Sequence, residues 1–141
     1  GNDIIQSVLI KTKEEHLIIF FRPHSDPRYI WKSHSTDQGI SWTTPDMTSL
    51  PNPLSGISTI SVNNSIAMIY NHTHEHKRYP LSVSVSRDKG TTWGEHWNLD
   101  NVKFEISYPS FILGNKNTVH GLYTYNRRMI KYVKFNTEKF C

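Results

Sequence analysis

The stretch "STDQGISW", residues 35–42, returns later in the chain as "SRDKGTTW", residues 86–93. Both copies follow the pattern Ser-x-Asp-x-Gly-x-x-Trp, and every matching residue lies 51 positions after its counterpart. Four fixed positions at one constant spacing indicate an internal repeat rather than a coincidence. A period near fifty residues is typical of propellers and other repeat arrays. The phrase therefore predicts a fold made of similar modules.

Alternating apolar residues and turn-forming residues divide the chain into three such modules, and no stretch has sustained helical periodicity. The sequence therefore predicts an all-β chain of four-stranded antiparallel blades, as in a β-propeller. We expect the blades to cover about 1–50, 51–104 and 105–141, the third stopping before another copy of the phrase. The strands expected from the pattern cover residues 7–12, 16–22, 29–35, 57–62, 66–71, 81–86, 110–114, 119–126 and 129–135.

The repeated phrase is expected where the third strand of a blade turns into the fourth. The carboxylates of Asp37 and Asp88 can accept backbone N–H groups across that turn, and the glycine two residues later can adopt a positive φ. Trp42 and Trp93 are expected to pack between sheets. A carboxylate bound to its own turn has few acceptors left for catalysis, and the loop offers too few oxygens for calcium. We interpret both aspartates as scaffold.

Composition narrows the class of protein. The 141 residues are 36% hydrophobic and 20% charged, and the formal charge of +4 is scattered rather than gathered into a nucleic-acid-binding patch. No apolar run approaches the ~18 residues of a membrane-spanning helix. The single cysteine, Cys141, cannot form an internal disulfide. Sequons at Asn63 and Asn71 would be used only in a secreted protein, and the sequence leaves the compartment open.

The repeated phrase resembles the Asp box of sialidases and of their relatives with bacterial neuraminidase repeats. The likeness extends along the chain, because "YIWKSHSTDQGISW", "LPNPLSG", "RYPLSVSVSRDKGTTW" and "SYPSFILGNKNTVHGLYTYNRR" follow, in order, the later blades of a sialidase-like propeller. Sialidases are six-bladed, so the resemblance implies about three blades, the C-terminal half of a propeller. It also implies that N-terminal blades or a second copy of the chain are needed to close the ring.

Sialidases hold the substrate carboxylate with three arginines and use a tyrosine nucleophile, a glutamate that serves as its base, and an aspartate acid/base. The resemblance places the second arginine on Arg22 in "IIFFR", the third on Arg78 in "KRYPLSV" and the nucleophile on Tyr108 in "SYPSF". The position of the glutamate falls on Asp3, a shorter carboxylate, while Glu105 lies near Tyr108 in a different segment. The first arginine and the acid/base aspartate belong to the N-terminal blades and are absent from this chain.

The residues support part of this chemistry without the family. Arg22, Asn71 and Asn126 follow equivalent strands, and such strand ends can converge near a propeller axis, where ligands bind. An arginine fork matches a planar carboxylate with two parallel hydrogen bonds. A tyrosine nucleophile suits a sugar whose anomeric carbon already carries a carboxylate, because an uncharged oxygen avoids like-charge repulsion until its proton is removed.

Two functions remain open. The first is an exo-α-sialidase acting on a sialic-acid-containing glycan, with no cofactor and no metal. The second is a non-catalytic sialidase-like propeller that binds a glycan or a protein, and Asp3 in place of glutamate favours it. The alternate histidines of "NHTHEH", residues 71–76, could share one face of a strand and bind a metal, but a polar loop is the simpler interpretation.

Overall fold

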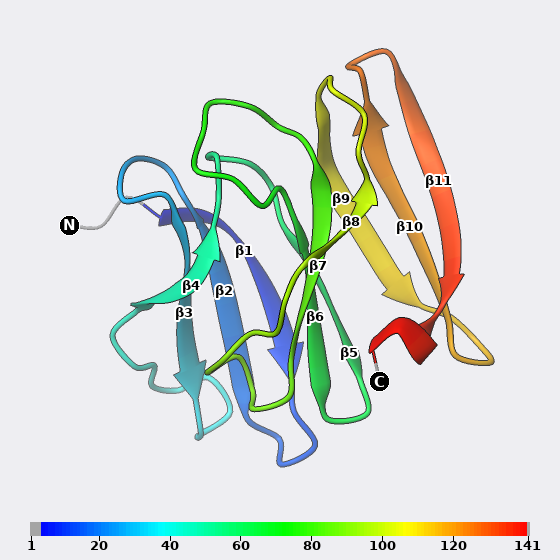
Figure 1. Ribbon diagram of the computed structural model, residues 1–141. Coiled ribbons are helices and arrows are strands. Elements are labelled where there is room, and N and C mark those ends of the chain that lie inside the picture. The colour runs from blue at the N-terminus through cyan, green and yellow to red at the C-terminus, as the bar shows by residue number, and fades with distance from the viewer. Residues whose placement is uncertain (1–3, 141) are drawn as a thin grey trace.

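The computed structural model describes residues 4–140, which form three antiparallel sheets standing side by side (Figure 1). Within these residues the third sheet has three strands, and the other two have four each. A short 3-10 helix, η1 (Thr137–Phe140), ends the described chain, which holds no helix long and apolar enough to span a bilayer. The strands are β1 (Ile4–Lys11), β2 (Leu17–Pro23), β3 (Tyr29–Ser35) and β4 (Asp46–Pro51), then β5 (Ser58–Val62), β6 (Ser65–Tyr70), β7 (Leu81–Ser86) and β8 (Trp97–Asp100), and finally β9 (Ile106–Leu113), β10 (Thr118–Tyr125) and β11 (Met129–Asn136).

The strands of each sheet are paired in chain order, and the first strands of the three sheets are neighbours. β5 contacts both β1 and β9, whereas the later strands of each sheet lie progressively further from this line. This is the arrangement of propeller blades, in which the first strand of each blade lies innermost. The all-β, partial-propeller prediction is therefore confirmed.

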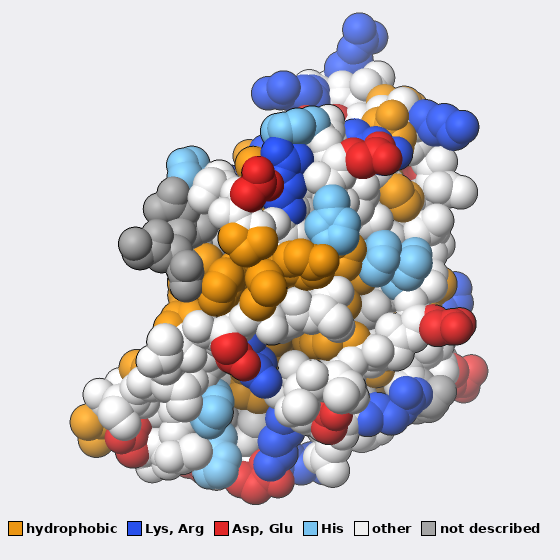
Figure 2. Space-filling model, turned by 60° about the vertical axis from the view of Figure 1, so that its left-hand side comes forward, with side chains coloured by type: hydrophobic (Ala, Val, Ile, Leu, Met, Phe, Trp, Pro, Cys, Tyr) orange, Lys and Arg blue, Asp and Glu red, His pale blue; other side chains and the backbone are white. Residues whose placement is uncertain are grey.

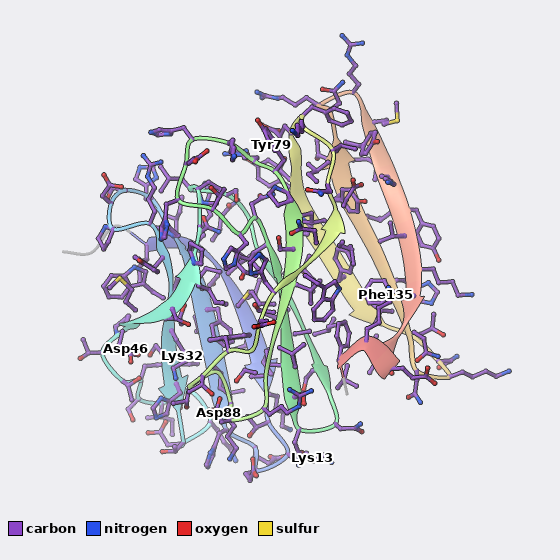
Figure 3. All side chains as sticks on the ribbon, viewed as in Figure 1. Lys13, Lys32, Asp46, Tyr79, Asp88 and Phe135 are labelled. Carbon is purple, nitrogen blue, oxygen red and sulfur yellow. The ribbon has the colours of Figure 1, made fainter. Side chains whose placement is uncertain are left out.

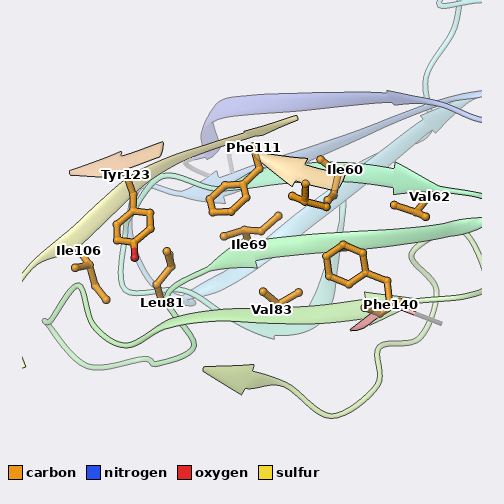
Figure 4. Close-up of a cluster of buried hydrophobic side chains, with 12 residues drawn as sticks. Ile60, Val62, Ile69, Leu81, Val83, Ile106, Phe111, Tyr123 and Phe140 are labelled. Atoms are coloured by element: carbon orange, nitrogen blue, oxygen red, sulfur yellow. The ribbon is translucent and has the colours of Figure 1, made fainter. Parts of the chain in front are cut away.

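Two apolar cores fill the spaces between the sheets. On β6, Met68 and Tyr70 face the first sheet, where they pack with Phe20, while Ile69 faces the third sheet. β6 is therefore buried on both faces, which explains its nearly continuous apolar sequence. The core between the second and third sheets is shown in Figure 4 and consists of Ile60, Val62, Ala67, Ile69, Leu81, Val83, Val85, Ile106, Phe111, Val119, Tyr123 and Phe140.

The outer faces of the first and third sheets are not covered by any of the described residues. Figure 2 shows hydrophobic side chains gathered on the side formed by the first sheet, which exposes Leu9 and Met47. The third sheet exposes Ile112, Leu122 and Tyr132 on its own free side. Apolar faces of this kind are expected where further blades of a propeller would pack.

The two Asp-box turns (residues 35–42 and 86–93) have the predicted structure. In the first, Asp37 Oδ1 accepts the Ser41 N–H at 2.8 Å and the Ser35 hydroxyl at 2.7 Å. In the second, Asp88 Oδ1 accepts the corresponding N–H of Thr92 at 2.8 Å. Hydrogen bonds from the Ser41 and Thr92 side chains, followed by those from their backbone N–H groups, lower the pKa of the two carboxyls to about 2. Both aspartates are bound to their own turns, as scaffold residues should be.

The tryptophans of the two turns differ in their packing. Trp93 lies between the first and second sheets, with its ring centroid 5.7 Å from that of Phe20 in an edge-to-face arrangement. Trp42 is 38% exposed, and its indole N–H donates to the Gly39 carbonyl at 3.1 Å. The expected packing between sheets therefore holds for Trp93, whereas Trp42 lies at the outer side of the first sheet.

Strand β9 begins earlier than its sequence suggests. The pattern predicts a strand over 110–114, but the pairing with β10 starts at Ile106. Between them a β-bulge places two residues, Tyr108 and Pro109, opposite one residue of β10, and Tyr108 has a φ of 52°. A bulge accommodates a proline inside a strand because the ladder hydrogen bond is already interrupted there. The bulge also places Tyr108 within the innermost strand of its blade.

Candidate functional site

Arg22, Arg78 and Tyr108 come from three different sheets or their connections and meet at one end of the molecule. Arg22 lies near the end of β2, Arg78 lies just before β7, and Tyr108 lies in the bulge of β9. Figure 3 shows the two ends of the second sheet, with Tyr79 beside this site and Asp88 of the Asp box at the opposite end. Antiparallel pairing brings the end of β2 and the start of β7 to the same side.

The two arginines converge on one backbone carbonyl. Arg22 Nη1 donates to the Leu54 carbonyl oxygen at 3.1 Å, and Arg78 Nη2 donates to the same oxygen at 3.3 Å. Leu54 has a φ of 64°, within the connection between the first and second sheets. Burial lowers the pKa of Arg22, and the charge of Arg78 lowers it further. Two guanidinium groups held this close favour an anionic ligand.

Tyr108 lies directly against Arg78. The guanidinium carbon of Arg78 is 5.3 Å from the centroid of the Tyr108 ring, and the tyrosine is 49% exposed. Hydrogen bonding and charge from Arg78, together with the charge of Arg22, lower the pKa of the Tyr108 phenol. Gly56 leaves room for the ring, because a Cβ at this position would lie 3.3 Å from Tyr108 Cδ1. The phenol is thus accessible, and it loses its proton more readily than an ordinary tyrosine does, which suits a nucleophile.

Two acids were expected near Tyr108. Asp3 lies outside the described residues. Glu105 is close enough for its charge to oppose the lowering of the Tyr108 pKa, but its carboxylate accepts the Ser107 hydroxyl at 3.0 Å and lies 3.7 Å from Arg127 Nε. The Arg127 side chain is exposed, and its contact with Glu105 joins the β10–β11 turn to the start of β9.

Open hollows border Arg78 and Tyr108. One, of about 500 Å³, is lined by Leu54, Arg78 and Glu105 among others, and a second, of about 280 Å³, includes Gly56 and Tyr108. Two further hollows lie at the Asp-box end, between the first and second sheets. The hollows at the Asp-box end also carry cationic side chains, including Lys11, Lys13 and Arg87, but neither is lined by a tyrosine. We assign the site to the end where Arg78 and Tyr108 lie against each other.

The other strand-end residues do not reach the site. Asn71 is fully buried beneath it, so its side chain is not open to a ligand. Asn126 is exposed in the turn between β10 and β11, where its N–H donates to the Glu105 carbonyl at 2.8 Å. The three residues therefore follow equivalent strands of their blades, but their side chains do not reach a common site.

The histidines of residues 71–76 form a polar loop. His72 stacks on His96 with ring centroids 3.6 Å apart, while His76 accepts a hydrogen bond from Arg28 at 2.6 Å. His74 packs edge-on against Tyr29. The three rings therefore have different partners, and no group of three or more His, Cys, Asp or Glu residues within residues 4–140 is arranged to bind a metal.

Sequence reasoning missed the connection between the first two sheets, residues 52–56. Three prolines and a glycine in residues 45–56 predict a connection between the first two modules, yet this stretch contains β4, and its end supplies the Leu54 carbonyl and the space at Gly56. The signal available was the glycine itself, since a conformationally free or very small residue often marks a close approach of another group. No sequence pattern could have shown which group approaches.

Comparison with known proteins identifies the family of this chain. A family described as "BNR repeat-like domain" matches residues 1–120. The chain belongs to this family. A search of curated proteins gave no significant match.

Solved structures of other proteins have the same fold. The chain resembles the Hadza microbial sialidase Hz136 with a TM-score of 0.83 and 18% identity, covering 99% of this chain and 29% of that one. The intramolecular trans-sialidase from Ruminococcus gnavus matches with a TM-score of 0.80 and 17% identity, covering 99% and 34%. An ulvan lyase, a polysaccharide lyase, matches with a TM-score of 0.67 and 14% identity, covering 95% and 39%.

The coverage of these structures defines how much of a propeller is present. The BNR-repeat chain spans about a third or less of the length of the sialidases it matches. Its three sheets are therefore a fragment of a larger propeller. At these identities the likeness concerns the fold, which carries both sialidases and a lyase.

Proposed function

We propose that this chain is part of a propeller that binds a terminal sialic acid, and that the complete propeller is an exo-α-sialidase. The observation that carries the proposal is the convergence of Arg22 and Arg78 on the Leu54 carbonyl, with Tyr108 against Arg78. Sialic acid carries its carboxylate on the anomeric carbon. A ligand whose carboxylate is bound by the two arginines would therefore present the reacting carbon to the adjacent tyrosine.

The proposed roles follow from the charges. The guanidinium groups of Arg22 and Arg78 hold the substrate carboxylate by charge-assisted hydrogen bonds. Tyr108 Oη attacks the anomeric carbon and loses its proton to a base, while the bond to the leaving oxygen breaks and that oxygen accepts a proton from an acid. Water then attacks the same carbon, releasing sialic acid with retained configuration and restoring the phenol.

The base and the acid determine what this chain can do alone. The acid/base aspartate and one arginine implied by the sialidase resemblance belong to other blades. General acid catalysis contributes roughly 10²–10⁴ in rate. We therefore expect the isolated chain to bind sialic acid weakly and not to hydrolyse a fluorogenic sialoside at rates ordinary for sialidases.

A second candidate, a non-catalytic propeller that binds a glycan or a protein, is favoured by the engagement of Glu105. Among residues 4–140 it is the acid that acts electrostatically on Tyr108, and it is already bound to Ser107 and close to Arg127. Oε2 of Glu105 already accepts the Ser107 hydroxyl, so this oxygen is engaged elsewhere than at the Tyr108 phenol. Under this alternative the arginines bind an acidic sugar and Tyr108 packs against it.

The test is binding of N-acetylneuraminic acid to the purified chain, followed by NMR and compared with its methyl ester and with glucuronic acid. We expect the acid to bind and the ester to bind at least about tenfold more weakly, because the ester removes the charge that both arginines recognise. Arg78→Met and Arg22→Met should weaken binding similarly. The matched control is Arg87→Met at the Asp-box end, where Arg87 donates to the Phe140 carbonyl.

Two results would contradict the proposal. Equal affinity for the acid and its ester would mean that the arginines do not bind the carboxylate. Preference for glucuronic acid over N-acetylneuraminic acid would assign the site to uronic-acid-containing polysaccharides.

A further inference from the structure

A buried amide lies beneath the site and connects the segments that carry it. Asn71, just after β6, is 0% exposed. Its Oδ1 accepts the Ser55 hydroxyl at 2.8 Å, and its Nδ2 donates to the carbonyls of Pro80 at 2.9 Å and Ile106 at 3.0 Å. One carbonyl-type oxygen and two N–H donors are thus all engaged, which fixes the orientation of the amide.

Each of these three partners is close in sequence to a group of the site. Ser55 follows Leu54, whose carbonyl oxygen accepts from both arginines. Pro80 lies two residues after Arg78, and Ile106 lies two residues before Tyr108. The partners come from the connection before β5, the segment entering β7 and the start of β9. A single side chain therefore bonds to all three segments, two of which are also joined by the hydrogen bond from the Ile106 N–H to the Arg78 carbonyl at 2.8 Å.

The Leu54 end of this arrangement is braced by a second buried amide. Asn52, also 0% exposed, accepts the Ser55 N–H at 2.8 Å and donates to the Ser55 carbonyl at 3.0 Å. Ser55 is thus held on its backbone by Asn52 and on its hydroxyl by Asn71. The turn they fix is the one that points the Leu54 carbonyl at the two guanidinium groups.

We propose that Asn71 is a positioning residue, whose amide sets the placement of Arg22, Arg78 and Tyr108 relative to one another. The assignment deepens the proposed function and rests on it for the identity of the ligand, but the geometry of the three side chains can be measured without a ligand. The same burial makes the Asn71 sequon inaccessible to glycosylation in the folded chain, because its amide is fully buried and hydrogen-bonded.

The proposed role requires an amide at residue 71, and another polar side chain of the same size would not suffice. An aspartate would have nearly the same shape but would face the Pro80 and Ile106 carbonyls with an oxygen in place of the donor NH₂. That change replaces two hydrogen bonds by repulsion and should separate the segments of Arg78 and Tyr108. Loss of the Ser55 hydroxyl is milder, since it releases only the Leu54 connection.

The experiment compares Asn71→Asp and Ser55→Ala with the unmodified 141-residue chain. The matched control is Ser82→Ala, because Ser82 is also 0% exposed and its hydroxyl donates to Asn98, away from the site. The readout is the ionisation of Tyr108, followed by NMR of ring-labelled tyrosine with the resonance identified in Tyr108→Phe. Binding of N-acetylneuraminic acid is measured on the same samples.

We expect the pKa of Tyr108 to rise toward the ordinary tyrosine value in Asn71→Asp, because Arg78 is no longer held against the phenol. It should rise by less in Ser55→Ala, where only the Leu54 carbonyl that accepts from Arg78 is released, and stay unchanged in Ser82→Ala. Sialic acid binding should weaken by about tenfold in Asn71→Asp and by less in Ser55→Ala. A folded Asn71→Asp or Ser55→Ala chain with an unchanged Tyr108 pKa would overturn the assignment, and if Asn71→Asp does not fold, Ser55→Ala decides. If the unmodified chain does not bind sialic acid, the proposed function fails, while the Tyr108 ionisation still decides the role of Asn71.

Discussion

The Asp-box turns and the arginine–tyrosine site occupy opposite ends of the same sheets, and they are built in different ways. The bonds that shape each turn are local, since those made by its serine and aspartate side chains join residues no more than four apart. The site joins residues between 24 and 35 positions apart, such as Arg22 with Leu54 and Asn71 with Ile106. A local motif can repeat unchanged in each blade, whereas a site assembled by long-range contacts can differ in every blade.

The two turns sharpen this comparison because their internal bonds are nearly identical while their surroundings are not. Gly39 and Gly90 both donate to the preceding serine hydroxyl at 2.8 Å. Only the second turn packs into the space between two of the described sheets, through Trp93 and Gly90. Local bonding therefore determines the shape of a turn, and the neighbouring blade determines how much stability it contributes.

The largest expected effect is the loss of catalytic turnover when Tyr108 is replaced at the site. In a complete propeller containing this chain, Tyr108→Phe should reduce sialoside turnover by about 10³-fold or more and leave sialic acid affinity nearly unchanged, because only the attacking oxygen is removed. Steady-state kinetics and equilibrium binding measure the two effects. Equal losses of affinity and turnover would show that Tyr108 packs against the ligand instead of reacting with it.

The next effect concerns the glycines of the two turns. A Cβ at Gly90 would lie 2.8 Å from Cζ of the buried Phe20 ring, whereas one at Gly39 would have its nearest neighbour at 3.5 Å. Both positions have a positive φ, 85° and 89°. Gly90→Ala should therefore cost about 3 kcal/mol of unfolding free energy and Gly39→Ala about 1 kcal/mol. Urea unfolding of the two variants checks the difference, and equal losses would mean that the contact with Phe20 adds nothing.

Removal of the turn carboxylates should have a smaller effect. Asp88→Ala should lower the melting temperature by about 3–8 °C, and Asp37→Ala by less, because the second turn also holds Trp93 against Phe20. Neither change should affect sialic acid binding measured well below the melting temperature, since both turns lie at the far end of the sheets. An unchanged melting temperature combined with lost binding would move the aspartates into the site.

The smallest expected effect is a pH dependence from the loop that leads to Arg78. Burial, followed by the charges of His96 and His74, lowers the pKa of His72 to about 4. The unfolded chain therefore binds a proton near pH 6.5 that the folded chain binds only near pH 4. The resulting stability is present above pH 6.5 and is lost as the pH falls to 4.

His72→Gln should flatten this part of the stability profile, measured by urea unfolding between pH 7 and pH 4. His34→Gln, on an exposed part of the first sheet, is the matched control. A profile in His72→Gln as steep as that of the unmodified chain would exclude His72 as its cause.

Much of the fold could be predicted because the determinants are local. The spacing of Ser35, Asp37, Gly39 and Trp42 specifies a turn, and its return in the second blade specifies a repeat. Strand alternation then gives the strands of each sheet except β4 and β8, which the four-stranded blade implies but the apolar pattern does not mark. The bulge at Tyr108 could not be predicted from the pattern, because it depends on which residue of β10 lies opposite Pro109.

Only those residues of the candidate site that lie in recognisable sequence motifs could be predicted. Arg22, Arg78 and Tyr108 could be selected by resemblance, and the structure places them together. The Leu54 carbonyl and the Asn71 amide could not be selected, because a backbone oxygen has no sequence signature and a buried asparagine looks like an exposed one. Both act across 24 or more residues of the chain for at least one partner.

The most direct test of the account is a crystal structure of the chain with N-acetylneuraminic acid bound. The account predicts that the ligand carboxylate lies between the guanidinium groups of Arg22 and Arg78, and that Tyr108 Oη faces the anomeric carbon. A ligand bound elsewhere, or bound here with its carboxylate directed away from the two arginines, would contradict it.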